Sequence, residues 1–302
     1  MRENIPIFRL RSSYDDRLVA RDGIVVSFFI HREHEEVAPA IWRALQTYLH
    51  AIPPNSLSWY PTDDGDWDPL DDKGWEVIRK EMFERPSALA WSVGLFEDPG
   101  ESRDYMFEYY GRRLDDPFYE APATTVSFTF PTEYLLEHGP DHFRALVFKL
   151  AWELPFSFGY ASLAVVKHHG IWGSPDFELL DAFLTRYLGM DFYHVRDTSS
   201  RIGAQARSAS WLTFLGQPLL GRLGGIESLR RALPFPEVSL LSLDSQRLMI
   251  TLSEWPDAID TEKGGIPPQY RALALQLKPF VYKEDPRFAP DYNYQWILRL
   301  GR

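Results

Sequence analysis

Six aspartates crowd into ten residues of the chain, and two tryptophans accompany them. This acidic segment consists of Asp63, Asp64, Asp66, Trp67, Asp68, Asp71, Asp72 and Trp75. Like charges at this density repel one another unless the segment stays solvated or meets cations. We interpret it as a partner-binding loop, because clustered carboxylates can occupy the positions at which a basic protein binds phosphates. The tryptophans would add apolar anchor area, since tryptophan is enriched at binding hot spots.

Two other interpretations of the acidic segment need to be weighed. A solvated loop that caps the following helix would explain the same residues, with Asp71 or Asp72 as the N-cap. The alternating aspartates at 64–68 also resemble a calcium-binding EF-hand loop. That motif requires glycine at its sixth position and glutamate at its twelfth, where this sequence has Pro69 and Trp75. We therefore expect neither a metal nor a cofactor here.

The remaining histidines and glycines form no catalytic motif. Residues 31–36 (HREHEE) lack the HExxH order that places two imidazoles on one helix face. The adjacent histidines at 168–169 diverge if they lie on a strand. Residues 159–163 (GYASL) are not a GxSxG elbow, and there is no phosphate-binding loop. The absence of cysteine excludes thiolate metal sites and cysteine nucleophiles. We expect a non-enzyme without catalytic residues.

Composition and charge narrow the class of protein further. The chain has 302 residues, of which 15% are aromatic, and a net charge of −11. The aromatic content indicates a packed globule rather than a disordered chain, and the acidity disfavours nucleic-acid binding. The N-terminus lacks the apolar core of a signal peptide, and no apolar run approaches the ~20 residues of a membrane helix. We expect a cytoplasmic protein that binds no membrane, and the oligomeric state stays open.

Hydrophobic periodicity predicts the elements that hold the acidic segment. Strands are expected at residues 23–30, 57–60, 88–97, 104–112, 124–130, 160–166, 238–243 and 247–252, and helices at 35–50, 73–84, 142–153, 175–188 and 269–277. Residues 61–72 are expected to form a loop between a short strand and a helix. The predicted fold class is α+β (mixed α/β), with helices packed on a largely antiparallel sheet.

Two short sequences recur about one hundred residues apart. VSF at 26–28 returns at 126–128, and RAL at 43–45 returns at 144–146. Each RAL triplet lies in a predicted helix that is followed by a proline, a short strand and a second helix. No flexible linker separates the two parts. We predict one domain over residues 1–302, built from two weakly related strand–helix–strand–helix halves at about 20–115 and 120–300.

Four segments of the C-terminal half resemble one known family. They are GYASLA at 159–164, RYLGMD at 186–191, WLTFLG at 211–216 and LGG at 223–225. In this order they are similar to the type VI immunity family of proteobacteria, formerly a domain of unknown function. The resemblance is clearest over residues 120–250. The glycine- and proline-rich segment usual after the family's last hairpin is replaced by SEWPDA at 253–258.

The resemblance implies a protein that neutralises a toxic effector of the type VI secretion system. It further implies a cognate protein toxin as partner, often a nuclease of the restriction-endonuclease type, blocked by occlusion of its active site. Two alternatives remain. One is an enzyme acting on carbohydrates or small molecules, which would need two carboxylates about 5–10 Å apart in a pocket. The other is an assembly protein of a secretion apparatus or phage-like particle.

Overall fold

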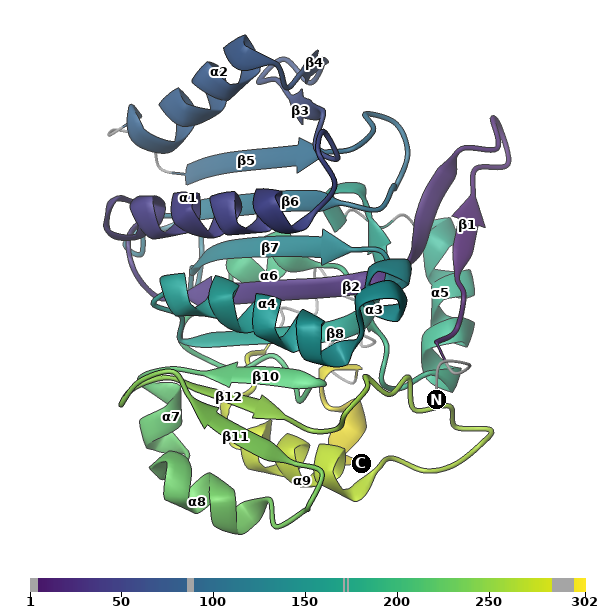
Figure 1. The fold of residues 1–302 in the computed structure, drawn as a ribbon, viewed down its shortest axis with the longest axis vertical. Coiled ribbons are helices and arrows are strands. Elements are labelled where there is room, and N and C mark those ends of the chain that lie inside the picture. The colour runs from purple at the N-terminus through teal and green to yellow at the C-terminus, as the bar shows by residue number, and fades with distance from the viewer. Residues whose placement is uncertain (1–4, 86–89, 171, 173, 284–295) are drawn as a thin grey trace.

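A computed structural model describes residues 5–85, 90–170, 172, 174–283 and 296–302. Twelve strands are described, and all belong to one sheet (Figure 1). Their bounds are β1 (Arg9–Arg11), β2 (Leu18–Ile30), β3 (Trp59–Pro61), β4 (Trp67–Pro69), β5 (Ala90–Phe96), β6 (Met106–Arg112), β7 (Thr124–Phe130), β8 (Phe158–Lys167), β9 (Asp191–Phe192), β10 (Leu212–Leu215), β11 (Ser239–Ser242) and β12 (Leu248–Thr251).

The sheet is antiparallel except where the short β9 pairs with β8. Its order is β11-β12-β10-β8-β2-β7-β6-β5-β3-β4, and β1 adds to one end of the long strand β2. The two edges are therefore β4, which carries part of the acidic segment, and β11, which comes from the C-terminal third. The predicted fold class, helices on a largely antiparallel sheet, is confirmed.

Helices cover both faces of the sheet. Helices α1 and α4 lie side by side on the face toward the viewer in Figure 1, and α6 and α9 lie behind the sheet. The helix bounds are α1 (His34–Ala51), α2 (Asp72–Phe83), α3 (Thr132–His138), α4 (Pro140–Glu153), α5 (Ser174–Arg186), α6 (Val195–Ser199), α7 (Leu219–Arg222), α8 (Gly225–Ala232) and α9 (Pro268–Leu277).

The central strand β2 shows why the sheet is buried on both sides. Because successive side chains of a strand point to opposite faces, Val26 and Phe28 enter the core beneath α1 and α4. Val25 and Phe29 enter a second core on the other face. A strand that is apolar at consecutive positions can only lie between two packed layers. The apolar run at residues 23–30 therefore fixes the centre of the fold.

The two recurring VSF triplets lie directly opposite each other. Strands β2 and β7 are antiparallel, with Ser27 opposite Ser127 and Val26 opposite Phe128. The two serine hydroxyls hydrogen-bond across the pair at 2.9 Å. Each triplet thus faces its own repeat in reverse order, as a twofold arrangement of two related halves would require. The duplication itself stays a prediction.

Two local expectations are corrected by the structure. The segment 61–72 is not a continuous loop, because residues 67–69 form β4 and pair with β3. The helix expected at 142–153 begins earlier, at Pro140, and a separate helix α3 precedes it. Glycine at 139 with φ +80° divides these two helices, a conformation that glycine adopts without strain. Positions 88–89 of the expected strand 88–97 lie outside the described residues.

Candidate partner-binding site

The acidic segment forms the turn of a small hairpin at one edge of the sheet. Strands β3 and β4 pair antiparallel, with Tyr60 opposite Asp68. The connecting turn is closed by a hydrogen bond from the Thr62 amide to the Asp66 carbonyl at 2.9 Å. Gly65 lies in this turn at φ +88°, which favours glycine. Helix α2 begins only three residues after β4, so the hairpin and the helix form one unit, the acidic hairpin, residues 59–75.

All six aspartates of the acidic hairpin are exposed, but they do different things. Asp71 is the N-cap of α2, because its carboxylate accepts from the amides of Lys73 at 3.0 Å and Gly74 at 2.9 Å. The capping interpretation is thus correct for this residue. Asp72 is the first residue of α2, where a negative charge favours the helix dipole. The Tyr60 hydroxyl donates to Asp68 at 3.4 Å.

The three aspartates nearest the tip have no such role. In the described part of the chain, no hydrogen bond or ion pair involves the side chains of Asp63, Asp64 or Asp66. Their charges face solvent at the outermost strand pair of the sheet. Local structure therefore accounts for Asp68 and Asp71, but not for the three carboxylates at the tip.

The two tryptophans of the acidic hairpin are half-buried on opposite sides of the sheet. Trp67 packs edge-on against Phe96, with ring centroids 5.2 Å apart, and belongs to the core behind the sheet. Trp75 packs edge-on against Trp42 of α1 at 6.2 Å, in the core beneath α1 and α4. They fasten the hairpin from two sides and do not form one aromatic surface.

Helix α2 is held tightly against the hairpin and against α1. A side chain at Gly74 would place its Cβ 2.7 Å from the Pro69 carbonyl oxygen, so helix and strand are in close contact. At the other end of α2, the His34 Nε2–H donates to the Met82 carbonyl at 2.9 Å. The Tyr109 hydroxyl donates to His34 Nδ1 at 2.7 Å. Burial lowers the pKa of His34, which keeps the ring neutral in this position.

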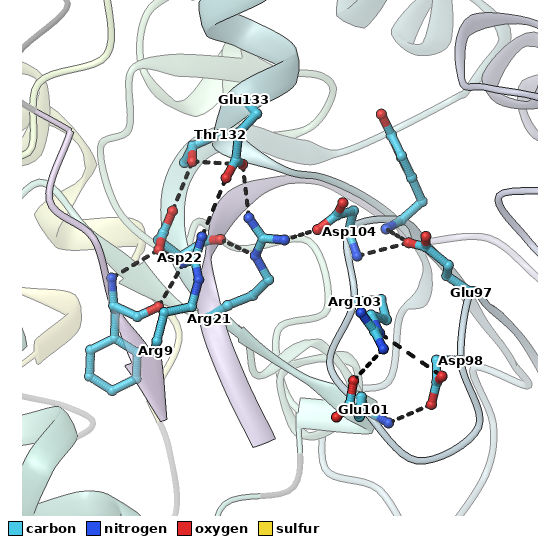
Figure 2. Close-up of polar contacts among 12 residues, drawn as sticks. Arg9, Arg21, Asp22, Glu97, Asp98, Glu101, Arg103, Asp104, Thr132 and Glu133 are labelled. Atoms are coloured by element: carbon cyan, nitrogen blue, oxygen red, sulfur yellow. Dashed lines mark hydrogen bonds and ion pairs between the residues drawn. The ribbon is translucent and has the colours of Figure 1, made fainter. Parts of the chain in front are cut away.

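A second polar cluster, formed by β2, the β5–β6 connection and the start of α3, was not anticipated from the sequence. Figure 2 shows Arg21 of β2 between two carboxylates, Asp104 and Glu133. The Arg21–Glu133 distance is 2.8 Å. Burial raises the pKa of Glu133, but backbone hydrogen bonding and Arg21 outweigh burial and hold it below the usual value. Glu97 accepts from the Asp104 amide at 3.0 Å, and burial raises its pKa.

The same cluster fastens the N-terminal strand. Asp22 is almost fully buried and binds Arg9 of β1 and the Thr132 hydroxyl, the latter at 2.8 Å (Figure 2). It also accepts from the Phe8 amide at 2.9 Å. The signal in the sequence was the charged pair Arg21–Asp22, which interrupts an otherwise apolar strand. A buried charge must be paired, so its partners had to come from other elements.

The chemistry of this cluster is structural. Each of its carboxylates is engaged by an arginine, a hydroxyl or a backbone amide. Among the residues that the structure describes, no group of three or more histidines, aspartates and glutamates has the geometry of a metal site. No helix in the described ranges is long and apolar enough to cross a membrane. The role of the acidic hairpin as the partner-binding site stays a prediction.

Comparison with known proteins places this architecture in a family. The model of the family TsiV, described as type VI immunity for VRR-NUC, matches residues 40–298. The chain belongs to the TsiV family. The match spans most of the chain, from α1 through the C-terminal region. It confirms the resemblance to type VI immunity proteins that the four C-terminal segments carry.

A solved structure shares the fold of this TsiV member. It is a Pseudomonas aeruginosa T6SS protein, which superposes with a TM-score of 0.77 at 18% sequence identity. The alignment covers 98% of this chain and 87% of the other. At this identity the similarity establishes the fold alone. No protein of curated function matches the chain in sequence.

Proposed function

We propose that this chain is an immunity protein that binds a cognate VRR-NUC effector toxin of the type VI secretion system and neutralises it without catalysing a reaction. The observation that carries the proposal is the family match over residues 40–298. A blocking protein needs a rigid surface rather than a reaction centre. The polar clusters described above hold elements in place, which suits that role.

We further propose that the acidic hairpin enters the active-site cleft of the toxin. A nuclease must present cations to the phosphates of its substrate. Asp63, Asp64 and Asp66 offer three negative charges on a short turn that packing holds from both faces of the sheet. Such charges would steer association with the toxin and keep its nucleic-acid substrate out of the cleft. Self-protection requires nanomolar binding or tighter, on the order of 12 kcal/mol.

The test is calorimetric titration of the toxin with a variant in which Asp63, Asp64, Asp66 and Asp68 are all changed to lysine. We expect the affinity to fall at least about a hundredfold, on the order of 3 kcal/mol, while thermal unfolding shows that the variant is still folded. The affinity of the wild-type protein should also fall as salt rises, because salt screens exposed charges.

A matched control reverses four exposed carboxylates elsewhere, namely Glu120, Glu137, Asp181 and Glu227. It makes the same change in net charge and should retain nearly wild-type affinity. Equal losses in both variants would show that only overall charge matters, and no loss in either would remove the acidic hairpin from the interface. If the wild-type protein failed to bind the toxin, the immunity function itself would be wrong.

A further inference from the structure

The opposite edge of the sheet is built differently. No described strand pairs with the outer side of β11, whose sequence is Ser-Leu-Leu-Ser. Edge strands are usually protected by charge, proline or a covering element. Strand β11 has neither a charged residue nor a proline, and the side chain of Leu241 is 46% exposed. Within the described ranges, this edge is therefore open to another protein surface.

An apolar groove runs beside this edge. Leu241 of β11 and Met249 of β12 lie opposite each other in neighbouring strands. Both side chains line the floor of the groove. Ala145 and Phe148 of α4 form the facing wall, and the groove has a volume of about 860 Å³. Trp152, one turn further along α4, is 52% exposed, and its ring lies 6.0 Å from that of Phe148.

The groove corresponds to an incomplete helix layer. On this face α1 packs along one side of α4, joined by the Arg43–Glu153 hydrogen bond at 2.6 Å. On the other side of α4, Figure 1 shows β10, β12 and β11 with no described helix in front of them. A sheet face of this kind is normally covered by another packed layer. The described helices leave the sheet face next to α4 uncovered.

The walls of the groove carry opposite charges. Arg144 and Lys149 lie on α4, whereas Glu237 and Glu254 lie on the strand side. Lys149 and Glu237 are both exposed, and no ion pair involves either of them within the described ranges. The same surface thus offers an apolar centre, a basic face of α4 and an acidic rim. A helix whose exposed face is apolar and basic would match the apolar floor and the acidic rim.

Helix α4 itself has this pattern, so we propose that the groove binds α4 of a second copy of this chain. A twofold interface uses the same patch on both partners. Here each copy places Phe148 and Trp152 over the other's β11–β12 floor. Lys149 of each copy then faces Glu237 of the partner copy. The dimer leaves the acidic hairpin free, because β4 lies at the far edge of the sheet.

The experiment is sedimentation velocity of the full-length protein over the micromolar range, without toxin. We expect a dimer for the wild type and at least a tenfold rise in the dissociation constant for Leu241→Lys. The control is Leu275→Lys on α9, where the leucine is equally exposed, at 47%, outside the groove. It should leave the dissociation constant unchanged. Circular dichroism would establish that both variants are folded.

Charge reversal tests the arrangement within the dimer. Lys149→Glu and Glu237→Lys should each weaken the dimer at least tenfold, and the double variant should restore most of the loss. A wild-type monomer throughout the concentration range would overturn the proposal, as would a dimer that survives Leu241→Lys. Loss in the single variants without recovery in the double variant would overturn the α4-in-groove arrangement.

Discussion

The two edges of the sheet meet the same physical problem, an unpaired row of backbone donors and acceptors, in opposite ways. At one edge, β4 is three residues long and contains an aspartate and a proline, and the acidic hairpin surrounds it with charge. At the other edge, β11 is uncharged, and it exposes Leu241 next to an apolar groove. Charge and proline prevent a strand from adding to an edge, whereas an apolar edge without them invites association.

This difference suits the two edges to two kinds of partner. A charged, well-anchored edge suits a partner of opposite charge, because the charges steer encounter and set specificity. An apolar, self-complementary edge suits a second copy of the same chain. The comparison predicts that substitutions at one edge leave binding at the other unchanged. It also predicts that the protein binds the toxin more weakly when the packing that holds the acidic hairpin is disturbed, even if all its carboxylates remain.

The largest effect on the free energy of unfolding is expected from Gly74→Ala, which presses a methyl group against the backbone of β4. Its Cβ would lie 2.7 Å from the Pro69 carbonyl oxygen and 3.0 Å from the Tyr60 ring. We expect a loss of about 1–3 kcal/mol in the free energy of unfolding, measured by urea denaturation, together with weaker toxin binding. Gly264→Ala is the control, since nothing lies within 4 Å of its added Cβ. Equal stability of the two variants would show that α2 and β4 are not tightly packed.

A smaller effect is expected from Asp71→Ala, which removes the N-cap of α2. Two amides lose their acceptor, and such caps contribute about 1 kcal/mol. Asp63→Ala is the control, because its carboxylate caps nothing, and it should leave the urea midpoint in place. For toxin binding we expect the opposite order, with a larger loss of affinity in Asp63→Ala than in Asp71→Ala. If Asp63→Ala destabilised the protein more than Asp71→Ala, the assignment of roles within the segment would be wrong.

The smallest effect is a dependence of stability on pH through His34. Its folded-state pKa lies below the unfolded value of about 6.5, so protonation favours the unfolded chain. The contribution of His34 to the free energy of unfolding is therefore fully present at neutral pH and decreases as pH falls below about 6.5. Denaturation at pH 7 and pH 5 should show a smaller difference for His34→Gln than for the wild type. Identical differences would mean that His34 does not titrate on unfolding in this range.

Much of the fold could be predicted from local patterns. The strands at 23–30 and 124–130 and the helices at 35–50 and 269–277 all carry apolar periodicity that depends on sequence neighbours alone, and the structure contains them. Strand β4 was missed because Asp68 and Pro69, two of its three residues, belong to types that are depleted in strands. Pairing with β3 and packing of Trp67 on Phe96 make it a strand.

The candidate site could be predicted only in part. The density of aspartates identified residues 63–72 as unusual, and their position before a helix limited the N-cap to Asp71 or Asp72, of which the structure selects Asp71. The burial of His34 could not be anticipated, because its partners Met82 and Tyr109 lie far away in the chain. The same is true of Arg21, which binds Asp104 and Glu133. Asp22 likewise accepts from the distant Thr132. Whether the acidic hairpin contacts the toxin stays a prediction that the charge-reversal variants test.

The sequence by itself determined the class of the protein, because composition, periodicity and the four C-terminal segments are properties of residue order alone. It also determined where charge accumulates. Only the tertiary structure decided which strands form the edges of the sheet and which aspartates are left without a structural role. Strand order and side-chain partners depend on contacts between residues distant in the chain, and no local pattern specifies them.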